Sequence, residues 1–163
     1  MAIRLGRIRQ VKLPVTALPR SVAWYRAVLG LALCAEFVED GVLRGALLMD
    51  RHQGFAIALR DRAVCASRPD LAGFDVFAIE MESVAALREL AAHCERLGVT
   101  HHGVHDRGEW GAGLDIPDPD GTVLRFLANN PFTADRFIGV EAGPDGEPMF
   151  YETPRLTERL DGR

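Results

Sequence analysis

Residues 11–30 of the chain read VKLPVTALPRSVAWYRAVLG, and this stretch decides the fold. Apolar residues stand at every second position of its first part: Val11, Leu13 and Val15. That period predicts a half-buried strand. The apolar residues that follow recur at helical spacing: Leu18, Val22, Tyr25 and Leu29. Gly30 is placed to end the helix. A strand therefore runs directly into an amphipathic helix.

The same pattern returns downstream. In the first half, the pattern predicts a helix at 18–29 and strands at 7–15, 31–38, 42–49 and 55–60. In the second half, it predicts a helix at 82–97 and strands at 76–81, 99–105, 112–116 and 122–127. A polar linker, 61–72, separates the halves. Ser21-Val22-Ala23 opens the first helix as Ser83-Val84-Ala85 opens the second. The sequence thus predicts an α+β fold made of two tandem βαβββ units.

Composition narrows the class of protein. The chain has 163 residues, and its net charge of −4 without a stripe of Lys and Arg argues against a nucleic-acid partner. No apolar run approaches the ~20 residues that span a membrane, so no membrane partner is expected. An odd set of three cysteines without metal-type spacing predicts free thiols and a cytoplasmic location. We expect one domain at 1–128, with units 7–60 and 73–128, and an extension at 129–163 that could add short strands at 136–140 and 149–153.

The doubled unit resembles the vicinal oxygen chelate superfamily, of the glyoxalase, bleomycin resistance protein and extradiol dioxygenase type. Strand 11–15, the residues Leu18, Ser21, Trp24, Tyr25, Leu29 and Gly30, and the turn Asp118-Pro119-Asp120-Gly121 carry the resemblance, which covers about residues 7–128. The resemblance implies that each sheet curls into half of an open barrel around a shared pocket. It also implies a homodimer, in some members with halves paired between subunits.

Many members hold a divalent metal through the first and fourth strands of each unit. The resemblance places these positions on Gln10, Ala58, Val76 (or Asp75, one residue away) and Arg125. Ala and Val side chains have no donor atom, and Arg is permanently charged. We therefore expect no cofactor and no metal ligand, with a divalent metal as the alternative.

Alternation along the strands predicts which residues face the pocket. The expected ligand-binding residues are Gln10, Ala58, Val76 and Arg125, with Trp110 from a loop. Two interpretations of Arg125 stay open: it binds an anionic group of a ligand, or it pairs with Glu80 or a carboxylate of the tail. Trp110 either stacks on an aromatic ligand or packs in the fold.

The candidates for acid–base catalysis are few. Glu80, Glu109 and His105 are the residues that could transfer a proton if they reach the pocket. His101 and His105 share a face of the predicted strand but lie ~13 Å apart, which argues against a local metal chelate.

Two functions remain after this reading. The first is a metal-free protein that binds a small, partly apolar, anionic or aromatic molecule, as the antibiotic-sequestering members of the superfamily do. The second is an enzyme, a glyoxalase-type lyase or isomerase or an extradiol-type dioxygenase. The residues alone do not decide whether the protein is an enzyme.

Overall fold

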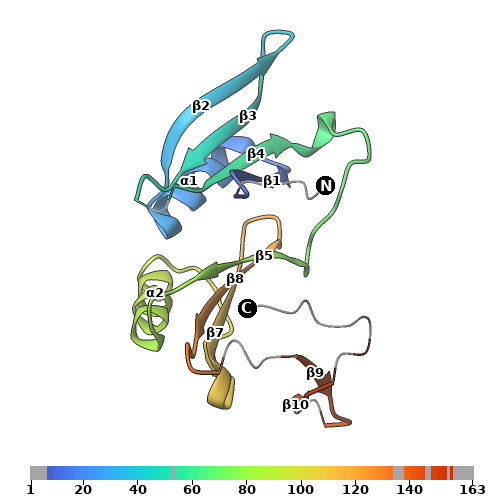
Figure 1. The fold of residues 1–163 in the computed structure, drawn as a ribbon. Coiled ribbons are helices and arrows are strands. Elements are labelled where there is room, and N and C mark those ends of the chain that lie inside the picture. Colours follow the sequence, from blue (N-terminus) through green and yellow to red (C-terminus); the bar gives the residue numbers. More distant parts are fainter. Residues whose placement is uncertain (1–6, 53, 134–137, 146–147, 154, 156–163) are drawn as a thin grey trace.

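The computed structural model describes residues 7–52, 54–133, 138–145, 148–153 and 155 (Figure 1). The first repeat consists of β1 (Gln10–Val15), α1 (Leu18–Leu29), β2 (Ala32–Glu39), β3 (Val42–Met49) and β4 (Ala56–Asp61). The second consists of β5 (Asp75–Glu80), α2 (Val84–Arg96), β6 (Val104–Asp106), β7 (Gly111–Pro117) and β8 (Val123–Asn129). The predicted α+β fold of two βαβββ units is confirmed.

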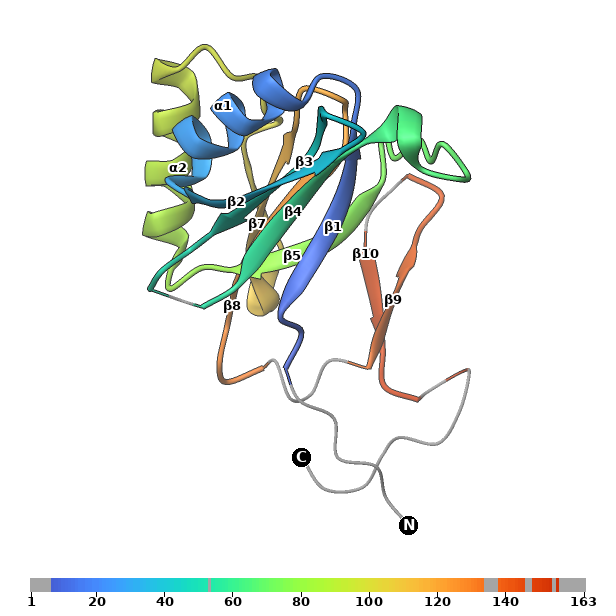
Figure 2. The same ribbon diagram turned by 90° about the horizontal axis from the view of Figure 1, so that it is seen from above.

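Each repeat builds one four-stranded mixed sheet. The strand orders are β1-β4-β3-β2 and β5-β8-β7-β6, so the two sheets have the same topology. The pairs β1–β4 and β5–β8 are parallel, and the other pairs are antiparallel. Both helices lie on the same side of the molecule (Figure 2). We call the sheet surface that faces away from the helices the open face.

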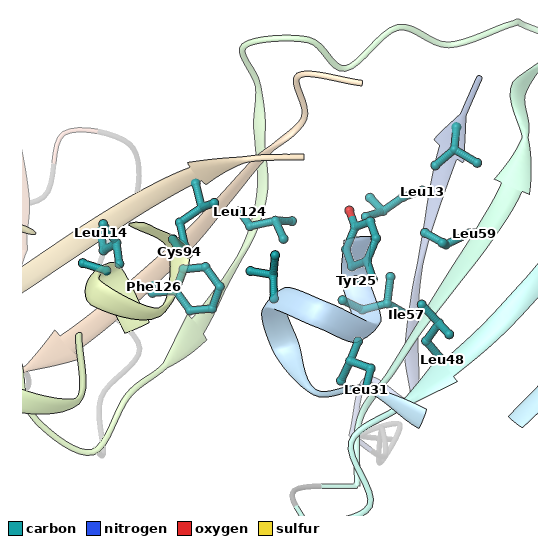
Figure 3. Close-up of a cluster of buried hydrophobic side chains, with 14 of the residues drawn as sticks. Leu13, Tyr25, Leu31, Leu48, Ile57, Leu59, Cys94, Leu114, Leu124 and Phe126 are labelled. Carbon is teal, nitrogen blue, oxygen red and sulfur yellow. The ribbon is translucent and has the colours of Figure 1, made fainter. Parts of the chain in front are cut away.

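The buried core lies between the helices and the sheets. Leu13, Val15, Ile57 and Leu59 of the first sheet are at most 1% exposed, as are Leu114, Ile116 and Leu124 of the second. Figure 3 shows Leu13, Ile57 and Leu59 around Tyr25, and Leu114 and Leu124 beside Cys94 and Phe126. In β1, β4 and β8 these buried residues are the ones that alternation along the strand places on the helix-facing side.

The two helices begin differently, although their sequences match. Ser83 is the N-cap of α2, and its Oγ accepts a hydrogen bond from the Ala86 N–H at 3.1 Å. Helix α1 begins at Leu18, as predicted, with Pro19 in its first turn, so Ser21, the sequence counterpart of Ser83, lies inside the helix. Ala17, the N-cap of α1, makes no side-chain capping bond.

The turn between β7 and β8 contacts α1 instead. The Asp120 carboxylate accepts hydrogen bonds from the Thr16 N–H, the Thr16 hydroxyl and the Ser21 hydroxyl, and it forms an ion pair with Arg20 at 3.2 Å. A carboxylate beside a helix N-terminus is favoured by the helix dipole. The second repeat thus supplies the group that α1 lacks.

Tyr25 and Asp118 form a buried contact between the repeats. The Tyr25 hydroxyl donates to Asp118 Oδ2 at 2.9 Å, and the backbone N–H groups of Asp120 and Thr122 donate to Asp118 Oδ1. Burial raises the pKa of the Asp118 carboxyl above its usual range despite these donors, and burial with the nearby carboxylate also raises the pKa of Tyr25. We call the contact of turn 118–121 with α1 the filled joint.

Two segments differ from the sequence-based expectations. The strand predicted at 99–105 is confined to β6, because the Gly103 N–H bonds to His101 Nδ1 and Gly103 has a φ of +82°, which interrupts an extended chain. The linker 61–72 contains a short 3-10 helix, Arg62–Val64, with Asp61 as its cap.

The tail forms an antiparallel hairpin of β9 (Gly139–Ala142) and β10 (Pro148–Tyr151). These strands lie close to the two that the sequence predicted, but residues 136 and 137 of the first prediction fall outside the described residues. No helix in the described part of the chain is long and apolar enough to cross a membrane.

Candidate functional site

A cavity of about 340 Å³ lies between the start of β1 and strand β5, where the two repeats meet. Its walls are mainly apolar and aromatic: Ile8, Val11, Phe55, Ala56, Phe77, Ala78 and Ile79. Arg9, Gln10 and Glu80 complete the walls and carry polar groups. A mostly apolar cavity with a few polar groups is the usual form of a small-molecule site, so this cavity is the candidate ligand site.

A second cavity, of about 330 Å³, adjoins the first and lies between α1 and α2. The two cavities share Phe55, Ile79 and Glu80. The other walls of the second are Val28, Leu29, Asp50, Met81, Glu82, Ala86, Leu90 and Phe126. The space available to a ligand therefore extends from the β1–β5 contact toward the helices.

The structure separates the residues predicted to bind a ligand. Gln10 lines the first cavity. Ala58 is buried on β4 opposite Lys12 and Leu47. Val76 is half-buried on β5, and Arg125 lies on β8 within a charged cluster of the second sheet. Whether these residues contact a ligand stays a prediction.

Arg125 lies between carboxylates from both neighbouring strands. Its Nη1 is 2.5 Å from Asp75 Oδ2 on β5, and its Nε and Nη2 donate to the two Asp115 oxygens on β7 at 3.0 Å each. The hydrogen bonds from the guanidinium hold the pKa of the Asp115 carboxyl below its usual range. Arg125 is thus ion-paired, but with Asp75 and Asp115 in place of the expected Glu80 or tail carboxylate.

An irregularity in β5 brings Asp75 to this position. Ala78 stands opposite Arg125, whereas Asp75 stands opposite Val123, so three steps along β5 match two along β8. An extra residue on one strand is the mark of a β-bulge, which changes the side that the following residues face. Regular alternation from Ala78 would have put Val76 opposite Val123. The one-residue alternative, Asp75, is the side chain that reaches Arg125.

The residues present do not fit the metal site that the fold family implies. Ala58 and Val76 offer no donor atom, and Arg125 brings a positive charge to the remaining position. Among the described residues, no three His, Cys, Asp or Glu side chains gather as metal donors. Gln10 offers one amide oxygen, and Asp75, the alternative to Val76, offers a carboxylate that is already paired with Arg125.

The three candidate acid–base residues lie in different surroundings. Glu80 lines both cavities. His105 lies on the open face of β6, over Gly113, where a Cβ would come within 2.5 Å of its Nε2. Asp115 stands two residues from Gly113 on β7, so it lies on the same face of the sheet as His105. Glu109 lies in the 3-10 turn Gly108–Trp110 before β7, where its backbone carbonyl accepts hydrogen bonds from two side chains.

Trp110 packs against the C-terminal hairpin. Its side chain is 9% exposed, and its ring centroid is 5.0 Å from that of Phe150 on β10 with the planes tilted by 35°. This contact supports the packing interpretation of Trp110, while ligand stacking stays untested. The contact between Tyr25 and Asp118 was not predicted from the sequence. Turn 118–121 was identified as a turn, and its carboxylates were the feature that could have indicated this contact.

The fold and the sequence together define the class of protein. A model of the Glyoxalase/Bleomycin resistance protein/Dioxygenase superfamily matches residues 7–126, which span both repeats. The chain therefore belongs to this superfamily, as the resemblance indicated. Among curated proteins, no sequence matches the chain.

Many solved structures have a fold similar to that of this chain, among them the following three. The chain is similar to a superfamily member from Sphaerobacter thermophilus (15% identity, TM-score 0.66, covering 77% of this chain and 98% of the other). It is also similar to TnmS3, an antibiotic binding protein from Streptomyces sp. CB03234 (16%, 0.65, 78% and 99%). A third is a lactoylglutathione lyase from Agrobacterium tumefaciens (19%, 0.60, 77% and 96%). At these identities the likeness establishes the fold alone.

Proposed function

We propose that the protein binds a small, partly apolar, aromatic molecule without a metal, in the manner of a sequestering protein. The observation that carries the proposal is the cavity between β1 and β5, whose walls include Phe55 and Phe77. Aromatic walls favour a ring-containing ligand through stacking and edge contacts. Gln10 and Glu80 supply hydrogen-bonding groups that orient it.

The charged side chains of the cavity favour a ligand without net charge. Arg125, which made an anionic ligand an open alternative, is paired with Asp75 and Asp115 and is not among the cavity walls. The walls carry one cationic side chain, Arg9, and one carboxylate, Glu80, so their formal charges cancel and the proposed ligand is neutral.

The comparisons are compatible with binding as the activity. One structural neighbour is an antibiotic binding protein and another is a lactoylglutathione lyase, so the same fold serves both binding and catalysis. Binding requires only an apolar cavity with a few fixed polar groups, and the described residues supply these.

A screen of small aromatic compounds, by thermal shift and then calorimetry, tests the proposal. Phe77→Ala removes a wall of the cavity and is expected to weaken binding of any hit by about tenfold, which is ~1.4 kcal/mol. Phe74→Ala is the matched control, because Phe74 is 58% exposed and lies outside the cavity walls. Hits that both variants bind as tightly as the wild type would place the ligand elsewhere and contradict the proposal.

The enzyme alternative rests on one specific observation: His105 lies over Gly113, on the face of the sheet that also carries Asp115 two residues along β7. A carboxylate beside an imidazole is an arrangement that can support general base catalysis. Assays with glyoxalase-type and extradiol-type substrates test it. Turnover that His105→Ala abolishes would favour the enzyme, and turnover unchanged in that variant would exclude His105 as the base.

We also propose a homodimer. Apolar side chains are exposed on the β2–β3 hairpin, where Phe37 is 47% and Val42 46% exposed. Exposed apolar groups of this kind favour association with a second surface. Analytical ultracentrifugation is expected to show a dimer that Phe37→Glu dissociates. A monomer at all concentrations would refute the proposal.

A further inference from the structure

The cluster around Arg125 has the layout of a cation site. The central strand β8 carries the cation, and the flanking strands β5 and β7 each contribute a carboxylate. Asp75 and Asp115 touch the guanidinium through three of its nitrogen atoms, at 2.5, 3.0 and 3.0 Å. In this strand, Arg125 occupies the position that the family resemblance assigns to a metal ligand. Its guanidinium carries a permanent positive charge.

We propose that the Arg125 guanidinium is a built-in replacement for the divalent cation, with Asp75 and Asp115 as its ligands. The bulge in β5 makes the arrangement possible, because it delivers Asp75, a charged residue, where regular alternation would deliver Val76. A second cation at this place would meet the repulsion of the guanidinium and would find both carboxylates engaged.

Removal of the guanidinium leaves two carboxylates facing the space it filled. Arg125→His places a third donor of metal-binding type between them, and Arg125→Ala leaves the carboxylates alone. Each variant is therefore expected to gain affinity for a divalent cation that the wild type lacks. The inference rests on the metal-free part of the proposed function.

Titration with Mn²⁺ and Zn²⁺, read by calorimetry and by melting temperature, tests the inference. The melting temperature of Arg125→His is expected to rise by about 5 °C at saturating cation, and that of the wild type to stay unchanged. The double variant Arg125→His with Asp115→Asn is expected to lose the gain. Arg60→His is the matched control, since Arg60 pairs with a carboxylate of a single residue, Glu39, at 2.7 Å on the first sheet.

Each outcome decides the matter. Cation binding confined to the Arg125 variants, and lost with Asp115→Asn, supports the inference. Equal binding by wild type and variants overturns it, and so does an absence of binding in both Arg125→His and Arg125→Ala. If a variant unfolds without cation, its refolding with Mn²⁺ is measured in place of the melting shift. Binding of aromatic compounds by the wild type is scored separately, so the proposed function can stand or fail on its own.

Discussion

The two repeats meet at two places that the internal symmetry makes equivalent, and the two are built differently. At the filled joint, turn 118–121 contacts α1 through Asp120, and Tyr25 bonds to the buried Asp118. At the second place, Asp50 and Phe55, which lie between β3 and β4, line a cavity of about 330 Å³ together with residues of α2. We call the second place the hollow joint.

The side chains on the helices explain the difference. Counted from the first residue of each helix, Leu18 and Val84, the residues Arg20 and Ser21 of α1 correspond to Ala86 and Leu87 of α2. The side chains of Arg20 and Ser21 both reach Asp120 of the turn. Ala86 is small, and it lines the cavity. A duplicated backbone can thus stabilise one joint and leave binding space at the other, because packing depends on side-chain volume.

The largest expected effect concerns Asp118. Asp118→Ala leaves the Tyr25 hydroxyl and two backbone N–H groups of the filled joint without their acceptor, and it should lower the free energy of unfolding by about 2–4 kcal/mol. Asp50→Ala, the equivalent change at the hollow joint, removes a local bond to the His52 N–H and should cost less. Urea denaturation of both variants measures the difference. Equal losses would show that the two joints contribute alike.

Tyr25→Phe isolates the bond between the repeats. The variant keeps the ring in the core but removes the donor to Asp118, and the expected loss of unfolding free energy is about 1 kcal/mol. Tyr151→Phe, on the β9–β10 hairpin, serves as the control and should change stability little. A Tyr25→Phe variant as stable as the wild type would mean that the hydroxyl bond makes no net contribution.

Ala86→Leu fills the hollow joint. The added methylene groups enter the cavity beside Leu90, so stability should rise by at most about 1 kcal/mol. Aromatic ligands that occupy this cavity should bind about tenfold more weakly. Ala85→Leu, at an exposed position of the same helix, is the control for helix propensity. Calorimetry with a hit from the ligand screen checks the result, and unchanged affinity would restrict the ligand to the β1–β5 cavity.

The smallest expected effects are opposite responses to pH. Burial raises the folded-state pKa of Asp118, so the stability of the wild type relative to Asp118→Asn should fall as pH rises from about 4 through that raised value. Hydrogen bonds from Arg125 lower the folded-state pKa of Asp115, so stability relative to Asp115→Asn should fall as pH decreases below about 4. Urea denaturation at several pH values between about 3 and 7 measures both pH dependences of the free energy of unfolding. This range extends about one unit beyond the expected transitions on either side. Slopes of the same sign would contradict the assigned causes.

Much of the fold was predictable from the residues. Strand alternation at 11–15 and helical spacing at 18–29 identified the unit, and its recurrence identified the repeat and the superfamily. These signals are local, because the periods of strands and helices are properties of neighbouring residues. The Asp-Gly pair at 40–41 is a further local signal, because both residues adopt the positive φ angles that the tight β2–β3 turn requires.

The sequence by itself determined the two βαβββ units and the helix-facing residues of β1, β4 and β8, and it predicted that Ala58 and Val76 cannot ligate a metal. Only the tertiary structure decided that Asp75 and Asp115 hold Arg125, that Tyr25 reaches Asp118, and that the joint beside Ala86 is hollow. The physical reason is that a bulge shifts register by one residue, and contacts between repeats join residues about 93 positions apart. The local periodicity of the sequence encodes neither the bulge nor these long-range contacts.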